Sequence, residues 1–252
     1  MARAFIGTSG WSYRHWRGVF YPAELPTSCW LSHYVEHFNT TEINSSFYHL
    51  PRASTCENWY RQTPPGFVFA LKASRFITHI KRLHEIEESL NLFVERAGVL
   101  RDKLGPVLLQ FPPSFHATTE NLERLEEFLR LADTDGPRIA LEFRHQSCFA
   151  PPVLDLLRRH GAALVIPHST RYPAPPPIAT GPFTYLRFHG PEAMFASCYP
   201  EEQLRQWSRV VTRFLRDGTD VYAYFNNDIG GHAVSNALAL RSMVEDGAGL
   251  GN

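Results

Sequence analysis

Short runs rich in β-branched and aromatic residues alternate with amphipathic stretches along the whole chain. The runs with strand character cover residues 4–8, 40–44, 67–71, 106–110, 138–143, 162–166, 183–188 and 220–225. Between them, apolar residues recur three or four positions apart, as Leu122, Leu125 and Leu129 do, which is the spacing of one helix face. Strands that alternate with helices are typical of a parallel sheet with helical crossovers. Eight such strands predict an α/β fold, a closed TIM (β/α)8 barrel, as a single domain over residues 1–252.

One crossover departs from this alternation. Residues 171–182 contain the run Tyr-Pro-Ala-Pro-Pro-Pro at positions 172–177, and prolines do not fit the interior of an α-helix. We therefore expect an extended, Pro-rich segment in place of the sixth helix, as a stiff connection inside the domain.

Composition narrows the classes of partner. Lys plus Arg and Asp plus Glu both number 25, so the formal net charge is zero, whereas proteins that coat nucleic acid usually carry a basic excess. The four cysteines are too far apart in the sequence for a metal knuckle or a C-x-x-C redox pair. The chain begins almost at once with a predicted strand, and no apolar run reaches membrane-spanning length. These features predict a cytoplasmic protein without a membrane partner.

Candidate functional residues gather where the predicted strands end. Barrels of this type carry their chemistry at the C-terminal ends of the strands, which we call the C-terminal rim. We assign Glu142, Glu42 and His189 to catalysis, and Trp11, Asn44, Lys72, Gln110, Arg144, His145, Arg187, Asn226 and Asn227 to ligand binding.

The charged residues of this set admit two interpretations. Two carboxylates around one pocket, Glu42 and Glu142, suit general acid–base chemistry. Arg144, Arg187 and Lys72 suit the binding of a small anion such as a phosphate group, which Asn226 and Asn227 would orient. Alternatively, the acidic and basic residues neutralise one another in an ion-pair network that only connects loops.

Metal binding has weaker support in the sequence. His33 and His37 lie four residues apart on the first predicted helix and can share a face, but we identify no third ligand beside them. A divalent metal at the rim, held by Glu42, Glu142, His145 or His189, is chemically allowed, yet no H-E-x-x-H or comparable spacing supports it. We therefore predict no cofactor and assign no metal ligand.

Ordered motifs span nearly the whole chain and carry a family resemblance. They read IGTSGWSY at 6–13, TEINSSFY at 41–48, FALKASR at 69–75, LGPVLLQFPP at 104–113, EFRH at 142–145, RFHG at 187–190 and YFNN at 224–227. This series resembles the YecE-like family, a widespread group of unsettled function. The resemblance implies an α/β barrel related to the endonuclease IV and xylose isomerase group, many of whose members hold divalent metals at the same rim. The chain lacks their dense set of His, Glu and Asp ligands, so the metal is not carried over.

Three functions stay open at this stage. The first is binding, and transformation if the protein is an enzyme, of a small phosphate-bearing ligand at the C-terminal rim. The second is nucleic-acid binding or endonuclease IV-like DNA processing, by analogy with the related barrels. The third is a noncatalytic ligand sensor. The sequence predicts neither the substrate nor the oligomeric state.

Overall fold

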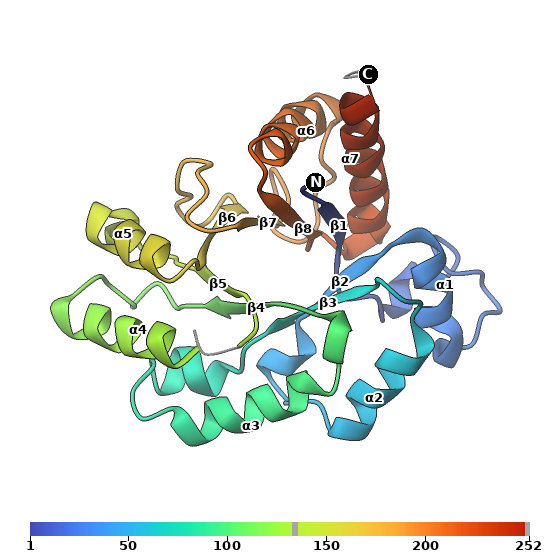
Figure 1. The fold of residues 1–252 in the computed structure, drawn as a ribbon. Coiled ribbons are helices and arrows are strands. Elements are labelled where there is room, and N and C mark those ends of the chain that lie inside the picture. Colours follow the sequence, from blue (N-terminus) through green and yellow to red (C-terminus); the bar gives the residue numbers. More distant parts are fainter. Residues whose placement is uncertain (133–135, 250–252) are drawn as a thin grey trace.

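All eight strands pair in parallel and in chain order, and β8 closes on β1 (Figure 1). The structure is a computed structural model and describes residues 1–132 and 136–249. Each strand lies within two residues of its predicted bounds, so the prediction of a TIM (β/α)8 barrel is confirmed. The strands are β1 (Ala4–Ser9), β2 (Thr40–Ile43), β3 (Val68–Lys72), β4 (Leu104–Gln110), β5 (Ile139–Glu142), β6 (Ala163–His168), β7 (Phe183–Phe188) and β8 (Asp220–Phe225).

Helices cover the outside of the barrel (Figure 1). Some of their ends follow directly from the sequence: α5 begins at Pro151, whose fixed φ suits the first helical turn, and the chain leaves it through Gly161 at a φ of 60°. Within the described residues, no helix is long and apolar enough to cross a membrane. The helices are α1 (Trp30–His37), α2 (Ala53–Gln62), α3 (Glu87–Gly98), α4 (Thr119–Ala132), α5 (Pro151–Arg159), α6 (Glu201–Arg216) and α7 (His232–Gly249).

The sixth crossover has the predicted irregular form. Residues 169–182, all of them described, contain no helix between β6 and β7. The hydroxyl of Thr180 donates to the carbonyl of Ala162 and accepts from the amide of Leu164, which fixes the end of the segment to β6. The Pro-rich segment also contributes Tyr172 to the site described below.

Apolar side chains fill two separate layers. The larger cluster lies between the sheet and the helices, and the smaller one fills the inside of the barrel. The inner cluster consists of Phe5, Ala70, Leu108, Ala140, Ala163, Val165, Phe183, Tyr185, Tyr222 and Tyr224. Because side chains alternate between the two faces of a strand, the residues two positions further along point to the same interior. On β3, β4, β5 and β7 these positions near the C-terminal end of the strand carry polar side chains.

Candidate functional site

A layer of polar side chains closes the interior of the barrel at the C-terminal rim. Lys72, Gln110, Glu142 and Arg187 each stand two positions after a residue of the inner apolar cluster. All four are buried, with at most 8% of the residue exposed. The alternation of the strands therefore brings charged groups from β3, β5 and β7 together on top of an apolar floor, where each needs a partner.

Arg187 is the centre of this layer. Its Nε and Nη2 atoms donate to the two carboxylate oxygens of Glu42 at 2.9 and 2.8 Å, which is the two-pronged geometry that suits a guanidinium. Its Nη1 donates to Glu142 at 2.6 Å, and Nη2 also reaches Asn44 Oδ1 at 3.4 Å. Arg187 and both carboxylates are at most 1% exposed, so this group of three is fully withdrawn from water.

Both carboxyl groups are held in the ionised form. Burial by itself raises the pKa of Glu42, but the charge and hydrogen bonds of Arg187 outweigh it and hold that pKa below its usual range. The same balance lowers the pKa of Glu142, to which Arg144 adds a second positive charge. The two carboxylates thus neutralise Arg187, and their assignment to acid–base catalysis stays a prediction.

Glu42 has two further donors that the sequence interpretation did not include. Ser9 Oγ donates to Glu42 at 2.7 Å and the Tyr185 hydroxyl at 2.8 Å. Tyr185 stands two positions before Arg187 on β7, so the same alternation that places Arg187 inside the barrel also predicts an inward Tyr185. Together with the two bonds from Arg187, each carboxylate oxygen of Glu42 accepts two hydrogen bonds. A buried carboxylate requires such partners.

A second pair of cations lies beside the first group and is satisfied less well. Lys72 Nζ and Arg144 Nη2 both donate to one neutral acceptor, Gln110 Oε1, each at 2.8 Å. Arg144 Nε also reaches Glu142 at 3.2 Å. Lys72 lies 4.1 Å from the centre of the Phe47 ring, and no carboxylate of the described residues contacts its Nζ. Two positive charges therefore share one amide oxygen.

The environment of Lys72 contrasts with that of another buried lysine. Lys103 Nζ donates to three oxygens, the carbonyls of Tyr60 and Thr63 and the hydroxyl of Thr63. Lys72 has three N–H donors as well, but Gln110 is its single hydrogen-bond acceptor among the described residues. Burial, and then the charge of Arg187, lower the pKa of Lys72 to about 7. The charges of Glu142 and Glu42 favour the ammonium form of Lys72 but do not outweigh burial and Arg187, and neither carboxylate contacts its Nζ.

His189 and Asn226, which directly follow β7 and β8, form a neutral pair. Asn226 Nδ2 donates to His189 Nδ1 at 3.1 Å, so the proton of the neutral imidazole sits on Nε2. Burial and the charge of Arg187 lower the pKa of His189 to about 3. His189 is therefore uncharged at neutral pH and presents an N–H donor, whereas a general acid at neutral pH needs a pKa near that pH.

Tyr172 extends the site from outside the strands. The Arg144 guanidinium lies 4.2 Å from the centre of the Tyr172 ring, which belongs to the Pro-rich segment. No periodicity could place this contact, since the segment has none. It gives Arg144 a fixed orientation at the mouth of the barrel, where the side chain is 16% exposed.

A pocket of about 490 Å³ opens beside the charged layer. Trp11 and Trp59 form an aromatic wall with their rings edge to face at 5.5 Å. Ser9 and Asn44, which contact Glu42 and Arg187, also line it, so the pocket adjoins the buried charges. The remaining lining is mostly polar and uncharged: Gly10, Ser12, Tyr13, Thr27, Ser28, Leu31, Ile43, Ser45, Asn58 and Gln62. Trp59, Asn58 and Gln62 come from α2, which the sequence interpretation did not connect with the rim.

Two of the residues assigned to ligand binding lie apart from this layer. His145 accepts from the amide of Ser147 at the start of a short 3-10 helix and stacks on His116 at 3.8 Å. Asn227 is fully buried and donates to the Ser197 carbonyl and to Asn236 of α7. Both side chains organise their own loops in the structure, and their assignment to ligand binding has no contact with the charged layer to support it.

Among the described residues, the rim does not gather three potential metal ligands around one point. Within residues 1–132 and 136–249, the only group of three His, Cys, Asp or Glu side chains close enough to hold one ion is His33, Glu36 and His37, which lies on α1. Glu42 and Glu142 instead face the guanidinium of Arg187 from two sides. The two carboxylates of the rim thus pair with Arg187 and Arg144 in this structure.

Fold and site together define a class of protein: a closed (β/α)8 barrel whose C-terminal rim buries an arginine between two glutamates, beside a polar pocket. The chain belongs to the DUF72 family, described as "Protein of unknown function DUF72", whose family model matches residues 5–250. The predicted membership in the YecE-like family is confirmed.

Named relatives and solved structures agree with this family. The chain is 28% identical to the UPF0759 protein YunF of Bacillus subtilis, over 96% of this chain and 94% of YunF. It is 29% identical to the UPF0759 protein YecE of Escherichia coli K12, over 58% of this chain and 50% of YecE. A DUF72 family protein of Thermotoga maritima superposes with a TM-score of 0.86 at 31% identity, covering 96% of this chain and 99% of that one. A DUF72 family protein of Enterococcus faecalis, at 24% identity and a TM-score of 0.82, has the same fold, with 97% and 96% of the two chains covered.

Proposed function

We propose that this protein binds a small, phosphate-bearing ligand at the C-terminal rim. The observation that carries the proposal is the pair Lys72 and Arg144, two cations that converge on the single neutral oxygen of Gln110. An anion between them would supply the missing counter-charge and accept the unused N–H donors of Lys72. Such a ligand would turn an unfavourable arrangement of like charges into a favourable one.

The charge balance of the layer supports the same conclusion. Glu42 and Glu142 both pair with Arg187. Among the described residues, the ion pair of Arg144 with Glu142 is then the one carboxylate contact that Lys72 and Arg144 have between them. The layer therefore carries an excess of positive charge when Lys72 is protonated. Field lines from a buried excess charge extend into the mouth of a cleft and attract small anions of opposite sign.

The neighbouring pocket gives the rest of the ligand a place. Its aromatic wall and its amide and hydroxyl groups suit an uncharged, hydrogen-bonding moiety, as in a sugar or nucleoside. We therefore favour a ligand that is charged at one end and polar but uncharged at the other. The proposal holds for an enzyme and for a noncatalytic sensor alike, and measurement of turnover on a bound ligand separates the two.

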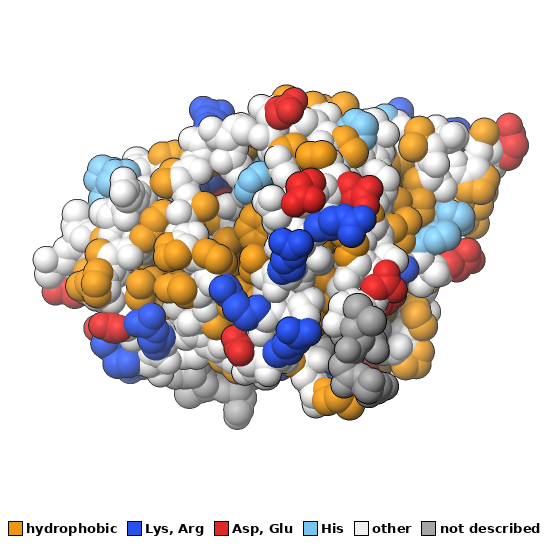
Figure 2. Space-filling model, turned by 90° about the horizontal axis from the view of Figure 1, so that it is seen from above, with side chains coloured by type: hydrophobic (Ala, Val, Ile, Leu, Met, Phe, Trp, Pro, Cys, Tyr) orange, Lys and Arg blue, Asp and Glu red, His pale blue; other side chains and the backbone are white. Residues whose placement is uncertain are grey.

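A long nucleic acid fits the face seen in Figure 2 less well. On the face shown in Figure 2, Lys and Arg side chains lie beside Asp and Glu side chains, without a broad basic area. A protein that follows a phosphate backbone needs several unpaired cations along its path. The formal net charge of zero agrees with a single local anion site.

Titration calorimetry with inorganic phosphate tests the anion site. We expect saturable binding by the wild-type protein and an affinity at least tenfold weaker in the Lys72→Met and Arg144→Gln variants, since each loses a charge-assisted contact. Arg171→Gln is the matched control, because Arg171 is an exposed arginine beside the same Tyr172 ring and should bind phosphate as the wild type does. Equal affinity in all four proteins, or no binding by the wild type, would contradict the proposal.

The pH dependence of anion binding is a separate prediction. Because the pKa of Lys72 is lowered to about 7, its ammonium form predominates below that pH and is lost above it. Affinity for sulfate, whose own charge is constant from about pH 6 to about pH 9, should therefore fall as the pH rises through 7. Calorimetry in buffers of different ionisation enthalpy should show proton uptake on binding at about pH 8. A flat profile, or one unchanged in Lys72→Met, would speak against Lys72 as the contact.

A further inference from the structure

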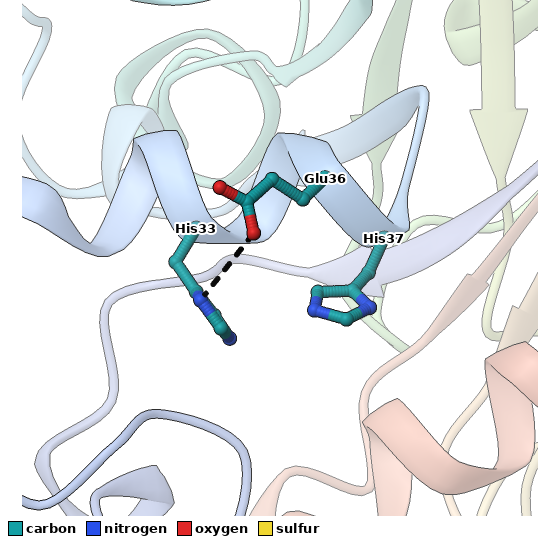
Figure 3. Close-up of side chains that lie close together, drawn as sticks. All are labelled: His33, Glu36 and His37. Carbon is teal, nitrogen blue, oxygen red and sulfur yellow. Dashed lines mark ion pairs between the residues drawn. The ribbon is translucent and has the colours of Figure 1, made fainter.

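Three potential metal ligands gather on one side of α1, and none of them belongs to the charged layer or lines the pocket. His33, Glu36 and His37 all project from the same side of the helix (Figure 3). One ligand atom of each lies within 4.8 Å of the others. The sequence spacing pairs the two histidines one turn apart, and the structure adds the carboxylate between them as the third ligand.

We propose that His33, Glu36 and His37 form a binding site for a divalent transition-metal ion, with zinc as the best match. Two imidazole nitrogens and one carboxylate oxygen are a donor set that zinc takes in proteins, with a fourth position open to water. Magnesium and calcium fit poorly, because they prefer sites made of oxygen atoms alone. The site is independent of the proposed anion site at the rim.

The hydrogen bond on the far side of the His33 ring supports the assignment. His33 Nε2 lies 3.2 Å from the carbonyl oxygen of Phe20, and because a carbonyl can only accept, Nε2 carries the proton. In the neutral imidazole the lone pair then lies on Nδ1, which is 3.8 Å from Glu36 Oε2 and is the nitrogen available to a metal ion. A histidine that binds a metal usually donates its other ring N–H to a carbonyl or carboxylate in this way, which fixes both tautomer and ring orientation.

Packing holds the two rings near their binding positions. The Phe20 ring contacts His33 at 5.1 Å and His37 at 5.2 Å between ring centres, and the two imidazoles are 5.0 Å apart. The Glu36 side chain is 69% exposed and can turn toward an ion. Zinc bonds of about 2.0–2.2 Å bring neighbouring ligand atoms to roughly 3.3–3.6 Å from each other. From separations of up to 4.8 Å, the site closes when the exposed Glu36 and the two rings shift by about an ångström.

Zinc titration calorimetry on the protein without a polyhistidine tag tests the site. We expect one ion per chain in the wild type, and an affinity at least tenfold weaker in each of His33→Ala, Glu36→Gln and His37→Ala. His84→Ala is the matched control: His84 Nδ1 lies 3.8 Å from Glu85 Oε2, the same separation as in the site, but this pair has no third ligand among the described residues. The control should bind zinc as the wild type does.

Folding and competing ligands are controlled in the same experiment. Glu36 is exposed, so Glu36→Gln should leave the unfolding transition of the metal-free protein unchanged and report on binding alone. Titration with Co²⁺ should give the stronger visible absorption of a four-coordinate ion in the wild type and lose it in His37→Ala. Unchanged zinc affinity in the three ligand variants, or its loss in Cys29→Ser, the exposed thiol just before α1, would overturn the proposal.

Discussion

Replacement of Arg187 by methionine is expected to destabilise the protein by about 3–5 kcal/mol at pH 7. The guanidinium is the common partner of Glu42 and Glu142, and all three residues are at most 1% exposed. Its removal leaves two carboxylates facing each other in a closed interior, where an uncompensated charge costs far more than the net gain from the intact pair. The free energy of unfolding from urea titration, by circular dichroism, measures the loss.

The pH dependence identifies the buried charges as the cause. In the wild type the pKa values of Glu42 and Glu142 are lowered, which stabilises the folded protein. This stabilisation is fully present above the ordinary glutamate pKa of about 4.3 and is lost as the pH falls below that value. In Arg187→Met, burial without the cation raises the same two pKa values, so the variant loses stability as the pH rises above about 4.3. The difference between the two proteins should therefore shrink toward pH 4.

Two further variants serve as controls for that result. Arg205→Met removes an exposed pair with Glu201 on α6 and should cost less than about 1 kcal/mol, because solvent screens such pairs. Combining Arg187→Met with Glu42→Gln and Glu142→Gln removes the charges together and should recover part of the lost stability. A loss in Arg187→Met that equals the control, or that does not vary with pH, would mean that the network is not sustained by charge.

The sequence predicts the barrel because two local signals agree at every step. Short runs rich in β-branched and aromatic residues mark the strands, periodicity near 3.6 marks the helices, and the prolines of residues 171–182 mark the crossover without a helix. The alternation of side chains along a strand predicts part of the site: Lys72, Gln110, Glu142 and Arg187 lie at or next to strand ends and point inward, as their positions indicate.

What the sequence could not predict is the pairing of those groups. Which carboxylate meets which cation depends on the registers between strands that are far apart in the chain, such as Glu42 and Arg187 at a separation of 145 residues. Contacts from irregular segments are likewise invisible to periodicity. Tyr172 reaches Arg144 from the Pro-rich segment, and His145 turns away from the rim to accept the amide of Ser147.

Replacement of Lys72 by methionine is expected to stabilise the protein by about 3 kcal/mol at pH 7 or below, while it weakens anion binding. Methionine keeps most of the length of the side chain and its contact with the Phe47 ring. Burial lowers the pKa of the Lys72 ammonium group to about 7, so the folded state disfavours its charged form. The substitution removes that group. Gln110 keeps a donor in the variant, because Arg144 still bonds to it.

The sign of the pH effect follows from proton uptake on unfolding. Between about pH 7 and the unfolded lysine pKa of about 10.4, the unfolded wild-type chain binds more protons at Lys72 than the folded protein does, so wild-type stability rises with pH. The advantage of Lys72→Met should therefore be full below pH 7 and decrease to nothing near pH 10. Urea unfolding at about pH 6, 8 and 10, with the partly exposed Lys81→Met as control, measures it.

A stable but non-binding Lys72→Met would connect energetics with function. A buried lysine beside Arg144 is expected to lower the stability of the ligand-free protein, and the anion that we propose would supply the charge that it lacks. Ligand should then stabilise the wild type and leave the variant unchanged, which thermal unfolding with and without phosphate can measure. If Lys72→Met is less stable than the wild type at pH 6, Lys72 serves the fold itself, and the anion site loses the observation on which it rests.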